Sequence, residues 1–241
     1  MRVLALDTTT RAGSVAVVDE NGVLFAERGD PSRSHAERLP GDLIRGMAAA
    51  GLPWKAIDLF AVASGPGSFT GLRIGIATIQ GLAFVGGKRI VPVSALLALG
   101  YGAAAGVACG EIVGAWIDAH RREVFSALYR VRDTRPYDVN RLEEIEPAAV
   151  GDPAATWLRW TDLARPAAVA GDGAVLYSDV FGGAARVVEP LALAPIIGWI
   201  AMARARCGET VDPAAVQPLY VRRPDAEIAR DVALESRPRD R

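Results

Sequence analysis

Two aspartates end apolar segments, at positions where a nucleotide site can be built. Asp7 ends a short apolar segment and is followed by the hydroxyls of Thr8 and Thr9, and Asp118 ends a second apolar segment. A carboxylate beside hydroxyls at a strand end can assist Mg²⁺ or a bound phosphate. An aspartate that only caps its own turn is the commoner case. We therefore predict at most a vestigial nucleotide site at Asp7, Thr8, Thr9 and Asp118.

The stretch 65–87, GPGSFTGLRIGIATIQGLAFVGG, is the second candidate for chemistry. It begins with turn residues, and Thr70 is expected to cap the helix that follows. A glycine-rich loop before a helix suggests phosphate binding, because free N–H groups and the helix dipole attract anions. The first three glycines, however, are spaced one residue too far for the dinucleotide fingerprint, and Gly87 stands where a P-loop has its lysine. The sequence favours a tight turn and a closely packed helix.

Small residues inside this helix need a reason, because glycine costs about 1 kcal/mol relative to alanine in a helix. Gly71 and Gly75 lie one turn apart, a spacing that lets another backbone approach closely. A second helix is predicted over 34–50, where Ser34 begins a capping box. We predict that both helices dock on a partner. The predicted interface residues are His35, Leu39, Leu43, Met47, Gly71, Leu72, Arg73, Gly75, Ile76 and Ile79.

The composition is that of a globular protein without a charged target. Of the 241 residues 51% are hydrophobic and 23% charged, and the net charge of −1 gives no general attraction to nucleic acid or membrane. Cys109 and Cys207 lack metal-ligand spacing, which fits a reducing, cytoplasmic setting. The uncharged span 90–110 is long enough to cross a membrane, but Pro92 and several glycines favour a buried strand followed by a core helix. We expect a soluble, cytoplasmic protein.

Apolar runs and turn signals predict the elements that position these residues. Strands are expected at 2–7, 14–18, 23–25, 59–63 and 89–93, with helices between them and a further helix after Ser94. The pattern then restarts, since Phe125 follows Asp118 at the same spacing as Ser14 follows Asp7. Two strand–aspartate–turn–strand units at matching phase predict an α/β protein with two related lobes.

We place the N-terminal lobe at 1–106 and the C-terminal lobe at 107–221. The second lobe is expected to contain a helix near 153–160, short strands at 167–170 and 185–188, and a helix at 191–207 whose packing on the first lobe stays open. Mixed charges without apolar periodicity follow, and they predict a mobile tail at 222–241.

Five motifs together resemble a known family. They are LALDTTT at 4–10, SHAERLP at 34–40, GPGSFTGLRIG at 65–75, IDAHRREVF at 117–125 and YVR at 220–222. These runs are similar to those of the TsaB family, and the resemblance covers nearly the whole chain. TsaB proteins belong to the actin-like ATPase superfamily, which is related to the ribonuclease H fold. The resemblance therefore implies a two-lobed actin-like fold with duplicated strand–turn–strand lobes.

The family also implies a role. TsaB is the non-catalytic partner subunit of the bacterial machinery that makes threonylcarbamoyladenosine next to the anticodon of tRNAs. It binds the catalytic TsaD-like subunit through helices of its N-terminal lobe, and an ATP-binding TsaE-like subunit docks on that pair. We expect the same surface to form a homodimer when the partner is absent, and tRNA to be met only through the complex.

The residues themselves argue against a metal. The catalytic paralogue binds a metal through His-x-x-x-His in the helix after the last N-lobe strand, and Ala95 and Leu99 stand at the corresponding positions here. The only histidines, His35 and His120, are expected to be a helix-start or interface residue and a turn residue. We therefore predict no catalytic residue, no metal and no cofactor.

Two other functions stay open. A self-sufficient actin-like ATPase or kinase, or a metallopeptidase-like enzyme, would have to use Asp7, Thr8, Thr9, Asp118 and the loop beginning at Gly65. Direct tRNA binding is a third possibility, and the near-neutral charge and the lack of a basic-aromatic cluster argue against it.

Overall fold

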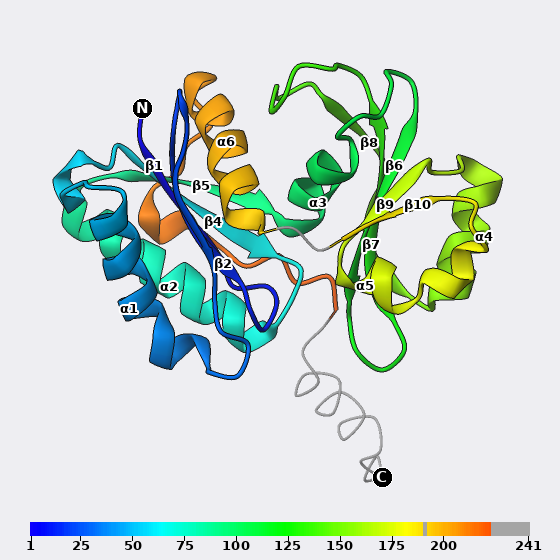
Figure 1. Ribbon diagram of the computed structural model, residues 1–241, viewed down its shortest axis with the longest axis horizontal. Helices are drawn as coiled ribbons and strands as arrows, with labels where there is room; N and C mark the ends of the chain where they lie inside the picture. Colours follow the sequence, from blue (N-terminus) through cyan, green and yellow to red (C-terminus); the bar gives the residue numbers. More distant parts are fainter. Residues whose placement is uncertain (190–191, 223–241) are drawn as a thin grey trace, which may run out of the picture.

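The computed structural model describes residues 1–189 and 192–222, and these form two five-stranded sheets beside each other (Figure 1). The first sheet has the order β3-β2-β1-β4-β5, and the second has the order β10-β9-β6-β7-β8. The strands of the first sheet are β1 Val3–Asp7, β2 Ser14–Asp19, β3 Gly22–Arg28, β4 Leu59–Gly65 and β5 Arg89–Ser94. Those of the second are β6 Ile112–Asp118, β7 Val124–Val131, β8 Leu142–Gly151, β9 Ala168–Ala170 and β10 Arg186–Val188.

Helices cover both sheets. They are α1 His35–Ala49, α2 Phe69–Gly86, α3 Ala95–Ala103, α4 Pro153–Leu163, α5 Asp172–Leu176 and α6 Leu193–Arg206. The capping box predicted at Ser34 is present, and Ser94 caps α3 as expected. The cap of α2 differs from the prediction. Ser68, rather than Thr70, accepts the hydrogen bond from the free N–H of Gly71, because α2 begins one residue before Thr70.

The two sheets have the same topology, which confirms the duplicated, two-lobed fold. In each, the first two strands form an antiparallel hairpin, and the fourth strand pairs in parallel with the first. The predicted equivalence of the two aspartates holds, since Asp7 and Asp118 both end the central strand of their sheet.

The last helix of each lobe packs on the sheet of the other lobe. In β1, Leu4 and Leu6 face α1 and α2, whereas Val3 and Ala5 face the opposite side, which α6 covers. Conversely α3, which falls in the range predicted for the N-terminal lobe, lies against β6 and β9. Alternate residues of one strand thus contribute to two different cores.

Residues 208–222, here called the strap, return from α6 across the N-terminal lobe to the second lobe. Val211 pairs with Ile90 beside β5, and Leu219 N–H donates to the carbonyl of Ser64 at 2.7 Å. Arg222, the first residue of the predicted tail, binds the loop after β6. The rest of that predicted tail lies outside the described residues.

Among the strands and α-helices described above, β8 and α5 were not predicted. The sequence of β8, LEEIEPAAVG, carries three glutamates and a proline because it is an edge strand that is only partly buried. Helix α5 is a single short turn after a glycine and shows no helical periodicity.

Among the described residues, α2 is the one helix long and apolar enough to span a membrane. Core helices pass the same test, and Ile76, Ile79 and Ala83 of α2 are packed in the N-terminal core. The span 90–110 forms β5 and α3, as predicted.

Candidate functional site

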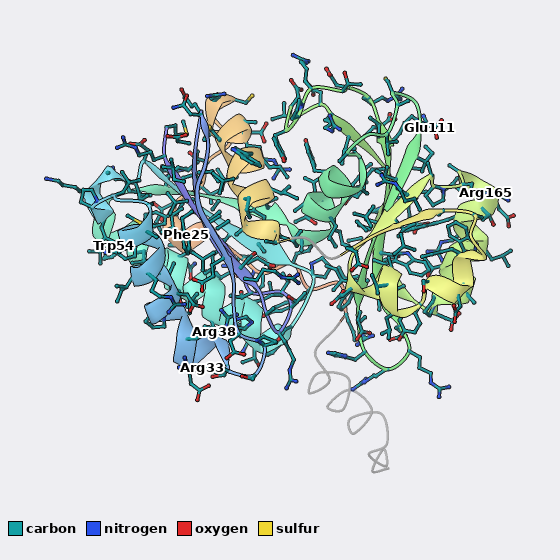
Figure 2. The ribbon with its side chains drawn as sticks, viewed as in Figure 1. Phe25, Arg33, Arg38, Trp54, Glu111 and Arg165 are labelled. Carbon is teal, nitrogen blue, oxygen red and sulfur yellow. The ribbon has the colours of Figure 1, made fainter. Side chains whose placement is uncertain are left out.

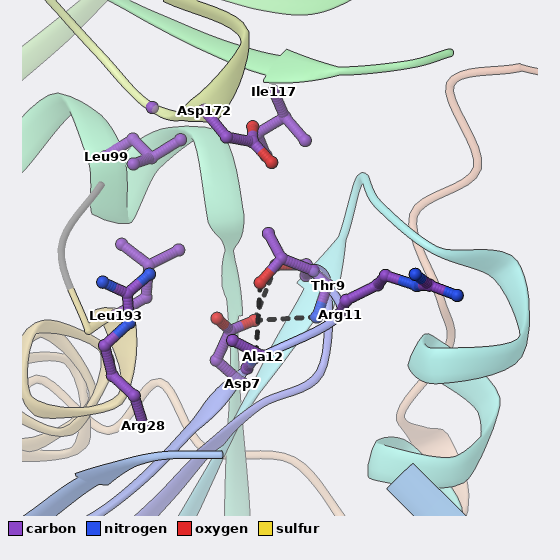
Figure 3. A pocket seen from close by; sticks show the side chains of 12 residues that line it. Asp7, Thr9, Arg11, Ala12, Arg28, Leu99, Ile117, Asp172 and Leu193 are labelled. Atoms are coloured by element: carbon purple, nitrogen blue, oxygen red, sulfur yellow. Dashed lines mark hydrogen bonds between the residues drawn. The ribbon is translucent and has the colours of Figure 1, made fainter. Parts of the chain in front are cut away.

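A cavity of about 230 Å³ lies between the lobes, where β1 and β9 end (Figure 3). Its polar lining comes from Asp7, Thr9, Thr10, Arg11, Arg28 and Asp172. Its apolar lining includes Leu99, Ile117 and Leu193. The volume is below the roughly 300–1,000 Å³ typical of sites for drug-sized ligands. The cavity therefore suits a small ligand better than a whole nucleotide.

Asp7 contributes one carboxylate to this cavity. Its Oδ1 accepts hydrogen bonds from the backbone N–H and the hydroxyl of Thr9, at 2.9 and 2.6 Å. Burial raises the pKa of Asp7, although both hydrogen bonds oppose that shift. A carboxyl with a raised pKa can hold a proton or bind a cationic group.

Asp172 contributes the second carboxylate, and Figure 3 shows it across the cavity from Asp7. Its Oδ1 accepts from the backbone N–H groups of Asp118 and Gly173, at 3.0 and 2.8 Å. Burial again raises the pKa of Asp172. Asp172 was not among the predicted site residues, although its position between two glycines just after a short strand was a usable signal.

The predicted nucleotide residues are only partly brought together. Asp7 and Thr9 line the cavity. Thr8 points the other way, against α2. Asp118 lies outside the lining, and its carboxylate binds His120 through the backbone N–H and the ring. Asp172 takes the place in the cavity that the duplication suggested for Asp118.

Leu99 lines the same cavity. By the resemblance described above, it stands where the catalytic paralogue has a metal-binding histidine. A leucine there offers no ligand atom. In the described ranges 1–189 and 192–222, no three histidines, cysteines or acidic residues cluster in a way that could hold a metal ion.

Buried polar residues of α1 form hydrogen bonds with the loop between β1 and β2. Arg38 donates to the carbonyl oxygens of Arg11 and Ala12 and pairs with the carboxylate of Asp42. The side chains of Arg38 and Asp42 are only 3% and 7% exposed. A buried arginine that satisfies several carbonyls fixes the loop at the cavity edge.

His35 completes this network. Its Nε2 lies 2.9 Å from the carbonyl oxygen of Thr10, and its Nδ1 lies 2.9 Å from Nη2 of Arg38. A carbonyl accepts and a guanidinium donates, so the arrangement requires a neutral ring with its proton on Nε2. Burial, reinforced by the charge of Arg38, lowers the pKa of His35 in keeping with that form.

The ten residues predicted for partner docking differ in exposure. Nine of the ten are buried within this chain, namely His35, Leu39, Leu43, Met47, Gly71, Leu72, Gly75, Ile76 and Ile79. The apolar periodicity selected the helix faces that cover the chain's own sheet. Arg73 alone of the ten is exposed.

The glycines of α2 have the same explanation. A Cβ on Gly71 would overlap the carbonyl oxygen of Thr8, and one on Gly75 would overlap the Thr8 hydroxyl. The small residues let α2 approach the turn after β1, so they serve the fold of this chain. A Cβ on Gly81, in contrast, meets nothing within 4 Å.

The outward faces of α1 and α2 carry large apolar side chains. Phe84 and Val85 near the end of α2 are 79% and 88% exposed, and Ile44 on α1 is 62% exposed. Ala77 and Gly81 continue the exposed line of α2. We call Ile44, Ala77, Gly81, Phe84 and Val85 the outer face. Exposed apolar groups on neighbouring helices are typical of a protein-binding surface.

Comparisons with known proteins agree with this architecture. Residues 29–150 match the family model of TsaD, tRNA N6-adenosine threonylcarbamoyltransferase. An uncharacterized protein of Mycobacterium tuberculosis is 32% identical, over 93% of each chain. The Escherichia coli tRNA threonylcarbamoyladenosine biosynthesis protein TsaB is 31% identical, over 73% of this chain and 81% of that protein.

Solved structures have the same fold. An ADPNP-bound activator of 2-hydroxyisocaproyl-CoA dehydratase from Clostridium difficile is only 11% identical but covers 87% of this chain and 97% of its own, with a TM-score of 0.50. A Pseudomonas aeruginosa protein with similarity to peptidase YeaZ is 30% identical, with a TM-score of 0.77 over 92% of this chain and 99% of that chain. The chain thus has a two-lobed, actin-like fold. Among proteins with this fold, the chain belongs to the TsaB family.

Proposed function

We propose that this chain is a non-catalytic subunit in tRNA threonylcarbamoyladenosine biosynthesis and binds the catalytic TsaD-family subunit through its outer face. The names of its relatives support the pathway. The observation that carries the binding surface is the pair Phe84 and Val85, both more than three-quarters exposed. Burying such side chains fully is worth about 1.5–3 kcal/mol each.

The other parts of the proposal follow from family membership. An ATP-binding TsaE-like subunit docks on the pair, the outer face forms a homodimer when the catalytic subunit is absent, and tRNA is met through the complex. The small cavity and the leucine at position 99 support a chain that does not itself carry out the transfer. The machinery works in the cytoplasm.

The experiment compares two double variants in titration calorimetry with the purified TsaD-family subunit of the same organism. Phe84→Asp with Val85→Asp places two charges on the outer face, and we expect at least about 100-fold weaker binding. Leu158→Asp with Leu163→Asp on α4 is the matched control, because those side chains are 64% and 56% exposed on the other lobe. Equal affinity of both variants and the unmodified chain would refute the docking surface.

A second function is supported by the two carboxylates of the cavity. An actin-like ATPase or kinase would use Asp7, and also Asp172, to hold Mg²⁺ and phosphate. Mg²⁺-ATP binding by the isolated chain, lost in Asp7→Ala, would favour that function. Calorimetry without any partner subunit separates it from the leading proposal.

A further inference from the structure

Two of the sequence motifs meet at one exposed cluster, which the cavity does not use. Phe69 and Arg73 come from the glycine-rich motif, and Tyr220 comes from the YVR motif on the strap. The rings of Phe69 and Tyr220 stack with centroids 5.3 Å apart. The guanidinium of Arg73 lies 4.0 Å from the centre of the Phe69 ring, and its Nε donates to the Tyr220 hydroxyl at 3.1 Å. We call these three residues the clamp.

The clamp is held together by several contacts and yet is open to solvent. Phe69 and Tyr220 stay 40% and 38% exposed although they stack. The strap that carries Tyr220 is fixed on α2, because the side-chain amide of Gln80 donates to the carbonyls of Pro213 and Val216 at 2.8 and 3.3 Å. Exposed aromatic rings held in place bind a partner at low entropic cost.

A groove of about 330 Å³ adjoins the clamp. Ile76, Ala77 and Gln80 form its α2 side, and Val216, Gln217 and Pro218 form its strap side. The groove therefore begins at Arg73 and runs onto Ala77 of the outer face.

Among the residues that the structure describes, Arg73 is the one charged residue lining this groove. Within residues 1–189 and 192–222 it forms no ion pair with a carboxylate, unlike Arg38, Arg45 or Arg159. Because its Nε is bound to Tyr220, the two terminal nitrogens remain to bind an acceptor from outside. Two parallel N–H groups of this kind fit a carboxylate in bidentate geometry.

We propose that the clamp and groove receive an acidic side chain, with its neighbouring apolar residues, from the docking segment of the catalytic subunit. The carboxylate binds Arg73, and the apolar neighbours enter the groove beside Ala77. This inference rests on the proposed function, since it takes the outer face to be the docking surface and adds an anchor at its edge. Because Arg73 is the one positive charge there among the described residues, the partner's segment is expected to carry a negative charge at this point.

A protein segment fits better than RNA. A strand of RNA carries a phosphate at every nucleotide, so proteins that bind it offer several cations along a groove. Here one arginine stands in an otherwise uncharged lining, and the chain as a whole has a net charge of −1.

The test uses the full chain and the purified TsaD-family subunit, titrated at low and high salt. Arg73→Gln is expected to weaken binding about tenfold or more and to flatten its salt dependence, because a charged hydrogen bond is lost. Arg73→Lys keeps the charge without the fork and is expected to lose less. Tyr220→Phe, which frees the guanidinium, is expected to weaken binding several-fold. Arg165→Gln is the matched control, since Figure 2 places Arg165 at the outer edge of the other lobe.

The outcomes separate this inference from the proposed function. Unchanged affinity and salt dependence of Arg73→Gln, with binding abolished by Phe84→Asp and Val85→Asp, would overturn the clamp and leave the docking surface standing. Unchanged binding in both would overturn both. Binding of an unmodified tRNA transcript to the isolated chain, lost in Arg73→Gln but not in Arg165→Gln, would overturn the clamp as a protein site and assign it to nucleic acid.

Discussion

The two lobes share one topology but hold their first hairpin loop in different ways. In the N-terminal lobe, Arg38 from α1 donates to the carbonyl of Ala12, and the pair it forms with Asp42 is buried. In the C-terminal lobe, Arg222 from the strap donates to the carbonyl of Ala119. Its pair with Glu123 is partly exposed, since the side chains are 22% and 38% exposed. Duplication of the backbone did not duplicate the interactions that stabilise it.

The helices after the fourth strands differ even more. α2 has 18 residues, whereas its counterpart α5 has 5. Among the described residues, the N-terminal lobe therefore is the one that offers two long neighbouring helices with an exposed apolar face. The shorter α5 brings Asp172 to the cavity instead, at the position where the other lobe has the loop beginning at Gly65. One lobe presents a surface, and the other completes the cavity.

Breaking the two arginine contacts tests this contrast at its strongest point. Arg38→Leu is expected to lower the free energy of unfolding by about 3 kcal/mol, the lower end for a broken buried ion pair, because Asp42 keeps its contact with Arg45. Arg222→Leu, the counterpart, is expected to cost at most about 1 kcal/mol. Urea unfolding of both variants measures the difference. Equal losses would mean that the two loops are held equally firmly.

The packing of α2 is tested by one substitution at two positions. Gly71→Ala forces a methyl group against the carbonyl of Thr8 and is expected to cost about 1–3 kcal/mol. Gly81→Ala, where the new methyl group meets nothing, is expected to stabilise the chain by up to about 1 kcal/mol. Thermal unfolding distinguishes the two. A neutral Gly71→Ala would show that α2 does not need its close contact with the β1 turn.

The smallest expected effect depends on pH. Burial raises the pKa of Asp7, so the folded state binds its proton more tightly than the unfolded chain does. Ionising Asp7 therefore lowers the free energy of unfolding. This loss is absent below the pKa of an aspartate in the unfolded chain, about 3.9. It grows as the pH rises toward the higher pKa of Asp7 in the folded state, and it is complete above that pKa. Asp7→Asn keeps an acceptor for Thr9 and should raise Tm at pH 7 by about 2–4 °C, or roughly 1 kcal/mol.

The gain in Tm of Asp7→Asn should disappear as the pH is lowered toward the pKa that Asp7 has in the unfolded chain. Asp118→Asn is the matched control in the other lobe and is expected to give no gain, because its partly exposed carboxylate stabilises the loop at His120. Scanning calorimetry from about pH 4 to about pH 8 measures the Tm of both variants and of the unmodified chain. A gain for Asp7→Asn that is constant with pH would contradict the ionisation argument.

The sequence alone determined the order of the strands and helices from β1 to α3, the duplication and the caps at Ser34 and Ser94. These depend on local patterns, namely apolar periodicity, turn residues and hydroxyls before helices. The family motifs added the role. Local pattern did not reveal β8, because an exposed edge strand rich in glutamate lacks the alternation of a buried one.

Only the tertiary structure decided what each apolar face covers. An apolar stripe on a helix packs equally well on its own sheet or on a partner, so periodicity selected Leu39, Ile76 and Ile79 as contacts although they form the core. The same limit hid Asp172 and Tyr220, whose neighbours lie far away in the sequence. Which residues meet across the cavity and at the clamp is determined by the docking of the lobes and by the strap, and no local signal carries it.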